Sequence, residues 1–402
     1  MLLFKLILEN NLIATGGIIN DLDKQDDKTR IKFRHNCKQK TSMTMAIFHV
    51  TDSVLVYLYT PPAQHGGTLV NMIIETLETI KFGEFVKFEN MEMVPLLAER
   101  AADYQYGVLD DVLKAESVRI TEVSEGGTVP ELSFLNESDE PVFLMDGEEL
   151  VGAKQNRVLN LSIMVPAGET IVIPVSCVEA GRWSYSSGEF QSGSKAQYAS
   201  ARASKSRSVS NNMSMFQEAR SDQEEVWAEL SSKSARMEAR SETSAMSEIY
   251  ETRKAELKQF ADHLKPVENQ VGVIFLINGS VAGLDLFDKS ETLAKLMPKL
   301  VESYALDAID PRAKAAKGES SDAQKTVEAF LEDVKQAQAA KSPSVGLGED
   351  CRLSNGSVTG GGLVVDGLLV HLGVFPGTGE TEDESQGRSA SLVRASRRRR
   401  MH

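Results

Sequence analysis

Cysteine, histidine and tryptophan are scarce in this sequence. It contains 3 Cys, 6 scattered His and 2 Trp in 402 residues, and it has no CxxC pair. So few cysteines exclude a disulfide-stabilised scaffold and favour a cytoplasmic protein with reduced thiols. The scattered histidines give no ligand spacing for a structural zinc site. We therefore expect neither a metal nor another cofactor.

Long apolar runs and an excess of positive charge are also missing. No stretch of about 18 apolar residues occurs, so we expect no membrane-spanning helix. Lys and Arg total 44 against 58 Asp and Glu, which gives a formal net charge of −14. This acidic balance argues against a general nucleic-acid partner, and we expect neither nucleic acid nor membrane as a partner.

The composition divides the chain into three parts. Residues 1–83 differ from the rest and are expected to form a small extra module or a poorly ordered N-terminal extension. They include a strand-like run at 54–59 and an amphipathic stretch at 69–80. Residues 84–376 carry the globular signal and are expected to form one domain. Residues 377–402 are rich in Gly, Ser and Glu and end in an arginine run, a composition typical of a disordered tail.

Alternating apolar residues predict strands within residues 84–376. The alternation over 159–165 and again over 171–175, with Pro166–Gly168 between them, predicts a β-hairpin. Pro174 has no N–H to donate, so its strand is expected to lie at a sheet edge or to bulge there. Three further apolar pairs are joined by Asp-Gly or Asn-Gly, which predicts type I′ turns beginning at Asp146, Asn278 and Asp366.

Helical patterns fill the middle of the chain. Residues 192–265 are expected to hold an inserted helical hairpin, with a capping box at Ser221–Glu224. A helix beginning near Ser290 contains Pro298, which should kink or end it. Another capping box, Ser321–Gln324, predicts a last helix. Because strands and helices are segregated along the chain, we predict an α+β fold in which antiparallel β-hairpins form a sheet core.

Motifs that would assign a reaction are absent. The sequence has no GxxxxGK[ST], HExxH, GxSxG or EF-hand loop. Candidate functional residues must therefore come from polar clusters where strands should be more apolar, and there are two.

The first polar cluster is Asp146–Arg157. Neighbouring strand residues point to opposite faces, so Glu148 and Glu149 are not expected to share a pocket as a glycosidase pair would. We nevertheless name these two glutamates as the candidate catalytic residues.

Four further side chains of this cluster are candidates for ligand binding: Lys154, Gln155, Asn156 and Arg157. A planar arginine beside an amide suits phosphate or carboxylate. The alternative is a solvated hairpin edge that prevents aggregation.

The second polar cluster is Cys177–Tyr185. In an extended chain Trp183 and Tyr185 share a face and Arg182 lies on the other. Such aromatic rings can stack on a base or sugar while the arginine meets an anion. The alternative is an aromatic plug in the core, with Arg182 paired to Glu179.

Several blocks of this sequence resemble the ARG-and-rhodanese-phosphatase-superfamily-associated protein family, in which ARG denotes ADP-ribosylglycohydrolase. The blocks are residues 85–97, 144–157, 176–185, 283–287, 303–307 and 344–350. The resemblance covers about 84–375. It implies a setting in ADP-ribose or nucleotide metabolism, with ADP-ribose-processing proteins as expected partners, and it carries over no catalytic residues.

Three functional hypotheses follow. The first is a module that binds an ADP-ribose-like or nucleotide-like anion, with Lys154, Arg157 and Arg182 on the diphosphate and the aromatic rings on a base or sugar. The second is an enzyme of the same pathway with a glutamate as general base. The third is a protein-interaction module that docks through the Ser-rich helical hairpin.

Overall fold

The computed structural model describes residues 19–25, 28–33, 44–50, 53–59, 66–99, 104–315 and 322–378. Contacts divide the chain into two units, 1–67 and 68–402. The tail expected to be disordered lies outside the described residues from 379 onward.

The first unit contains two antiparallel hairpins. One pairs β1 (Ile19–Gln25) with β2 (Lys28–Phe33), and the other pairs β3 (Thr44–Val50) with β4 (Ser53–Tyr59). The strand-like run of the sequence is therefore β4. Whether residues 1–83 act as an extension stays a prediction.

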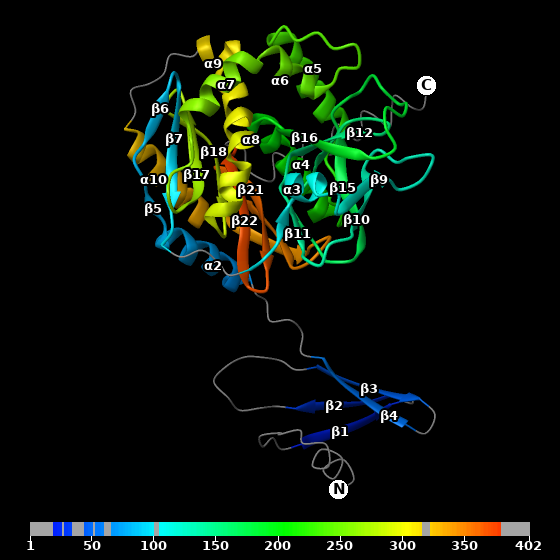
Figure 1. The fold of residues 1–402 in the computed structure, drawn as a ribbon. Coiled ribbons are helices and arrows are strands. Elements are labelled where there is room, and N and C mark those ends of the chain that lie inside the picture. Colours follow the sequence, from blue (N-terminus) through cyan, green and yellow to red (C-terminus); the bar gives the residue numbers. More distant parts are fainter. Residues whose placement is uncertain are drawn as a thin grey trace, which may run out of the picture. The chain divides into compact units, whose positions relative to one another are not determined.

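A nine-stranded antiparallel sheet is the largest sheet among the described residues of the second unit (Figure 1). Its order is β19-β20-β21-β22-β18-β17-β7-β5, with β6 also paired to β7. The strands are β5 (Lys81–Phe82), β6 (Val86–Phe88), β7 (Met91–Leu97), β17 (Gln270–Ile277), β18 (Ser280–Phe287), β19 (Gln338–Pro343), β20 (Glu349–Ser354), β21 (Val358–Val365) and β22 (Leu368–Pro376). Hairpins distant in sequence thus join one sheet, which confirms the predicted α+β class.

The remaining strands form two smaller sheets. A six-stranded sheet has the order β16-β12-β13-β15-β10-β9, and a three-stranded sheet has the order β14-β11-β8. The strands are β8 (Gly107–Val108), β9 (Val118–Glu122), β10 (Glu131–Asn136), β11 (Val142–Leu144), β12 (Glu148–Gly152), β13 (Arg157–Leu159), β14 (Ile163–Val165), β15 (Thr170–Cys177) and β16 (Phe190–Ala196). Both candidate polar clusters belong to the six-stranded sheet and its loops.

The described residues also form helices. They are α2 (Gly66–Thr79), α3 (Leu109–Lys114), α4 (Ala199–Phe216), α5 (Gln223–Arg236), α6 (Met246–Thr252), α7 (Lys254–His263), α8 (Ser290–Ala308), α9 (Pro311–Ala315) and α10 (Ala323–Lys335). The predicted helical insert is confirmed, with α4 to α7 lying between 199 and 263, although 192–196 belong to β16. Within the described ranges, no helix is both long and apolar enough to cross a membrane.

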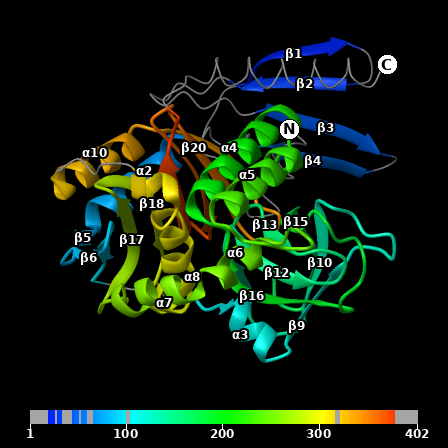
Figure 2. The same ribbon diagram turned by 90° about the horizontal axis from the view of Figure 1, so that it is seen from above.

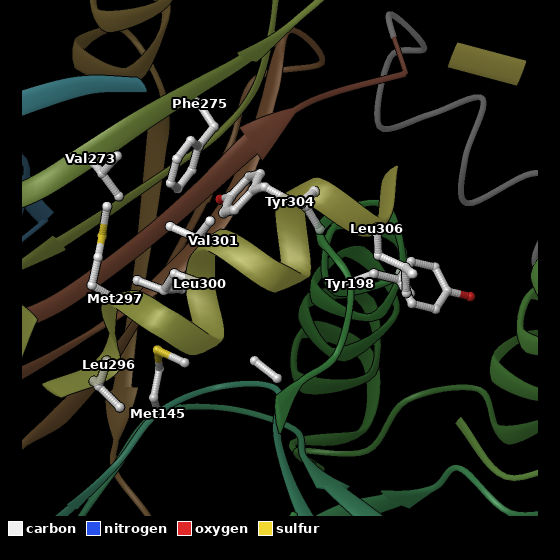
Figure 3. Packing of buried hydrophobic residues seen from close by; sticks show 14 of the residues in the cluster. Met145, Tyr198, Val273, Phe275, Leu296, Met297, Leu300, Val301, Tyr304 and Leu306 are labelled. Atoms are coloured by element: carbon white, nitrogen blue, oxygen red, sulfur yellow. The ribbon is translucent and has the colours of Figure 1, made fainter. Parts of the chain in front are cut away.

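Two hydrophobic clusters cover opposite faces of the nine-stranded sheet. Successive residues of β17 alternate between them, because Phe275 belongs to the cluster with α8 and Ile274 to the cluster with α2 and α10. Figure 3 shows Met297, Leu300 and Tyr304 of α8 directed toward β17. Burial on both faces explains why β17 is a nearly continuous apolar run.

The turn chemistry holds at two of the three predicted sites. Asn278-Gly279 and Asp366-Gly367 have positive φ at both residues, 52° and 81° in the first pair and 50° and 79° in the second. These values fit type I′ turns between β17 and β18 and between β21 and β22. The prediction is wrong at Asp146-Gly147, because β11 and β12 belong to different sheets and do not pair with each other.

The hairpin predicted over 159–175 is only partly present. Leu159 pairs with Val175 through β13 and β15, but β14 leaves to pair with β11 in the three-stranded sheet. The expectation for Pro174 is also wrong. Its strand, β15, lies between β10 and β13 in the six-stranded sheet. Pro174 is the last residue of β15 that pairs with β10, and pairing with β13 begins at the next residue. The missing N–H of Pro174 therefore removes no hydrogen bond between strands.

The structure corrects three details of the predicted helices, namely the N-caps of two helices and the effect of Pro298. The N-cap of α5 is Asp222, which accepts from the Glu224 N–H at 2.9 Å, because the Ser221 hydroxyl is bonded to Ser176. Likewise Asp322 caps α10, and Ser321 lies outside the described residues. Pro298 does not end α8, since it is solvent-exposed and water can bond the carbonyl it leaves free.

Helix α2 generates a test of the domain boundary. Leu69, Ile73 and Leu77, spaced by four residues, are buried in the α2–α10 cluster. We expect Ile73→Ala to lower the free energy of unfolding by about 2–5 kcal/mol in urea denaturation, and exposed Glu75→Ala to change it little. If residues before 84 were an extension without structural role, both variants would match the wild type.

Candidate functional site

The two candidate catalytic glutamates occupy different surroundings on β12. Glu148 is buried, accepts from the Lys299 ammonium at 2.6 Å, and accepts from the Met145 N–H at 2.8 Å. Lys299 also bonds Asp110 at 2.7 Å. Glu148 therefore ties β12 to α8, and both its oxygens are occupied.

Glu149 is fully buried, and neither of its oxygens has a hydrogen-bond partner. Burial and the nearby charge of Glu179 raise its pKa to about 8, against an opposing effect of Lys195. Gly193 of β16 leaves the space for this carboxyl, because a Cβ there would lie 2.6 Å from Glu149 Oε2. At neutral pH this side chain carries its proton.

Arg157 lies at the base of the first polar cluster. The guanidinium is fully buried, donates from Nη1 to the Gln155 carbonyl at 2.9 Å, and donates from Nε to the Val129 carbonyl at 3.2 Å. Its Nη2 has no hydrogen-bond partner and lies 3.9 Å from Glu122 Oε1. Burial lowers the pKa of this arginine, although the group remains a cation.

Lys154 joins the two polar clusters. Its ammonium lies 5.3 Å from the Trp183 ring centre and 5.1 Å from that of Tyr185. It also donates to the carbonyls of Glu125 and Gly126, both at 2.6 Å. The Arg157 guanidinium lies 5.7 Å from the same Trp183 ring. We call Lys154, Arg157, Trp183 and Tyr185 the aromatic–cationic cluster.

The two aromatic rings of this cluster remain exposed. Trp183 is 48% exposed and Tyr185 54%. The alternative that they form an aromatic plug in the core is therefore wrong. Both rings lie near the Lys154 ammonium, although their segment is a loop between β15 and β16 and not the extended chain that was assumed.

Arg182 holds the second cluster against the first. It donates to Glu179 at 2.6 Å, to Asn156 Oδ1 at 3.1 Å and to the Ala153 carbonyl at 2.6 Å. Burial acts to raise the pKa of Glu179, but hydrogen bonds from Arg182, Thr243 and the Asn156 N–H outweigh it and lower that pKa. The pairing of Arg182 with Glu179 was expected under the alternative in which the second polar cluster belongs to the core.

Seven of the nine candidate residues thus form one connected group, and the two glutamates stand apart from it. Glu149 lies near enough to Glu179 to feel its charge, while Glu148 turns to α8. Sequence reasoning missed Glu122, whose Oε2 is unpartnered, and the loop carrying Glu125 and Gly126. The glycine pair at 126–127 after a strand was the available signal for that loop.

A serine, a histidine and an aspartate also meet, in the order of a hydrolase triad. The Ser162 hydroxyl lies 2.9 Å from His371 Nδ1, and His371 Nε2 lies 3.4 Å from Asp285 Oδ1. All three are buried, and Asp285 already accepts two hydrogen bonds from Arg202, at 3.1 and 2.7 Å, and one from Tyr304 at 2.9 Å. We therefore assign this trio to the structural core.

These observations define an α+β domain with a polar cluster between the loops of its six-stranded sheet. The model of the ARG and Rhodanese-Phosphatase-superfamily-associated Protein domain, ARPP-1, matches residues 79–375, and the chain belongs to this family. The resemblance found in the sequence is confirmed. No curated protein and no solved structure matches the chain.

The burial of Glu149 predicts a pH dependence of stability. Its carboxyl ionises near pH 4.5 when unfolded but only near pH 8 when folded. Below pH 4.5 this carboxyl is protonated in both states, so it does not change the free energy of unfolding. As the pH rises toward 8, the unfolded state loses the proton before the folded state does, and the free energy of unfolding falls by about 4 kcal/mol. Glu149→Gln should remove this loss in urea unfolding measured from pH 5 to 8.5. Exposed Glu131→Gln is the control, and parallel curves for wild type and Glu149→Gln would contradict the assignment.

Proposed function

We propose that this domain binds a nucleotide-like anion, with ADP-ribose as the first ligand to test, at the aromatic–cationic cluster. The observation that carries the proposal is the pair of exposed rings, Trp183 and Tyr185, with the Lys154 ammonium about 5 Å from both centres. Exposed aromatic rings offer faces on which a base stacks. The ammonium adds attraction for a phosphate.

Arg157 supports an anionic ligand. Its Nη2 is a buried charged donor without a hydrogen-bond partner, which is costly unless something else bonds it. The Trp183 ring lies over this guanidinium, so an anion reaches Arg157 only when the ring moves aside. Arg182 has a positioning role in this proposal, because its donors are engaged by loop carbonyls and Glu179.

Membership of this family supports a role in ADP-ribose or nucleotide metabolism. Its description links the domain to ADP-ribosylglycohydrolase and rhodanese-phosphatase families. We include ADP-ribose-processing proteins as proposed partners on this ground.

Calorimetry with ADP-ribose tests the binding proposal. Trp183→Ala and Tyr185→Ala should each weaken binding by roughly 5- to 150-fold, since losing a stacked base costs about 1–3 kcal/mol. Both residues are exposed, so the fold should be retained.

Phe216→Ala is the matched control, because it removes an equally exposed ring from α4. In a Trp227→Phe background Trp183 is the one remaining tryptophan of the chain, and its fluorescence should change on ligand addition. Equal affinity of all variants, or no binding by the wild type, would reject ADP-ribose as the ligand of this cluster.

A second candidate function is hydrolysis in the same pathway, which one observation favours. Glu149 has a pKa of about 8, within the range of a general acid or base that works near neutral pH. We expect release of free ADP-ribose from a mono-ADP-ribosylated protein to fall at least about 100-fold in Glu149→Gln.

The matched control for this second candidate is Glu131→Gln, with folding of each variant checked by circular dichroism. Equal rates for Glu149→Gln and wild type would remove Glu149 from the chemistry. If the wild type releases no ADP-ribose, the hydrolysis candidate is rejected and only the binding function remains as a proposal.

A further inference from the structure

A polar cavity is lined by residues other than those of the aromatic–cationic cluster. It has a volume of about 290 Å³ and is bounded by the second half of α4 and by β19, β20 and β21. Helix α4 packs on β21 and β22, and it lies beside α5 (Figure 2). We call this cavity the α4 groove. Its size approaches the range of small-molecule sites.

The described side chains that line the α4 groove include basic but no acidic ones. Two arginines, Arg207 of α4 and Arg352 of β20, line it. Among the described residues that line it there is no Asp or Glu, although acidic side chains outnumber basic ones in the sequence by 58 to 44. The carboxylate of Asp350, which is paired with Arg352, is not among these lining residues.

The guanidinium of Arg352 is held in place. Asp350 accepts from its Nε at 2.7 Å and from its Nη2 at 2.6 Å. Its partner across the β20–β21 ladder is Gly361, where a Cβ would lie 2.5 Å from Arg352 Nη1. The absent side chain at 361 thus makes room for a fixed cation at the wall of the groove, a preorganised position for an anionic ligand.

Hydroxyl and amide groups complete the lining. Asn211 and Ser214 come from α4, and Ser354 and Thr359 come from the sheet. Neutral donors of this kind, together with arginines, are the groups that bind phosphate oxygens in proteins. They also suit the hydroxyls of a small polar molecule that carries the phosphate.

From this lining we propose that the α4 groove is a binding site for a phosphate monoester, carried by a small metabolite or by a lipid headgroup. The site is independent of the aromatic–cationic cluster and does not require it. Glycerol 3-phosphate is a suitable probe, because it has no ring to stack on Trp183, and glycerol is its neutral counterpart.

Calorimetry with the full chain tests the proposal. We expect glycerol 3-phosphate to bind, with affinity that falls as salt increases, and glycerol not to bind. Asn211→Asp and Arg207→Gln should each weaken binding roughly tenfold, because they add a negative charge to the lining or remove a positive one. Trp183→Ala should leave this binding unchanged, which separates it from the ADP-ribose proposal.

Gln217→Glu is the matched control, since it adds the same charge at the exposed end of α4, outside the residues that line the groove. Equal weakening by Gln217→Glu and Asn211→Asp would show a general charge effect and overturn the proposal. So would equal binding of glycerol and its phosphate, or no binding of either.

Vesicles distinguish the two sources of the phosphate. A lipid headgroup predicts sedimentation of the protein with phosphatidic acid vesicles but not with phosphatidylcholine, and Asn211→Asp should reduce this sedimentation. A small metabolite predicts binding of glycerol 3-phosphate without vesicle binding. Vesicle binding that Asn211→Asp leaves intact, without binding of the free ester, would contradict the assignment to this groove.

Discussion

The buried ion pair of Arg202 and Asp285 joins the helical layer to the nine-stranded sheet. Both side chains are fully buried, and the guanidinium donates to both carboxylate oxygens. Burial alone would raise the pKa of Asp285, but Arg202 and His371 hold it well below its usual range. Removing one partner from such a pair leaves an uncompensated charge and costs about 3–5 kcal/mol. The position of α4, and with it the α4 groove, depends on this contact.

The same arginine reaches toward the six-stranded sheet. Its Nε lies 3.5 Å from Asp146, and Lys205, one turn further along α4, lies 2.7 Å from the same carboxylate. Asp146 is the residue from which the chain enters β12 through Gly147, whose φ is 86° and where a Cβ would lie 3.1 Å from Arg202. The glycine is therefore needed for both its conformation and its space. One helix thus sets the position of both sheets, and Glu148 adds a second tie through Lys299 of α8.

Local patterns in the sequence predicted helices, strands and turns better than they predicted which strands pair with one another. The helices expected near Ser290 and after the second capping box, and the Asn278-Gly279 turn, need only neighbouring residues, and these predictions were confirmed. Alternation over 159–165 identified buried strand faces but not the sheet each strand joins, because a period of two carries no information about the neighbour. Hence β14 was assigned to the wrong hairpin. The caps moved by one residue for a similar reason, since Ser221 bonds Ser176 of a distant strand.

The candidate site shows the same division between local and distant information. The rings of Trp183 and Tyr185 are two residues apart in one loop and both lie near Lys154, whereas the isolation of Glu149 depends on Gly193 and Glu179, which lie far along the chain. The unpartnered buried atoms of Glu122, Glu149 and Arg157 each cost on the order of 1–3 kcal/mol of stability. All three residues belong to the six-stranded sheet that carries the exposed rings on one of its loops. Stability alone would favour apolar side chains at these positions, and this cost is the physical ground on which the proposed binding function rests.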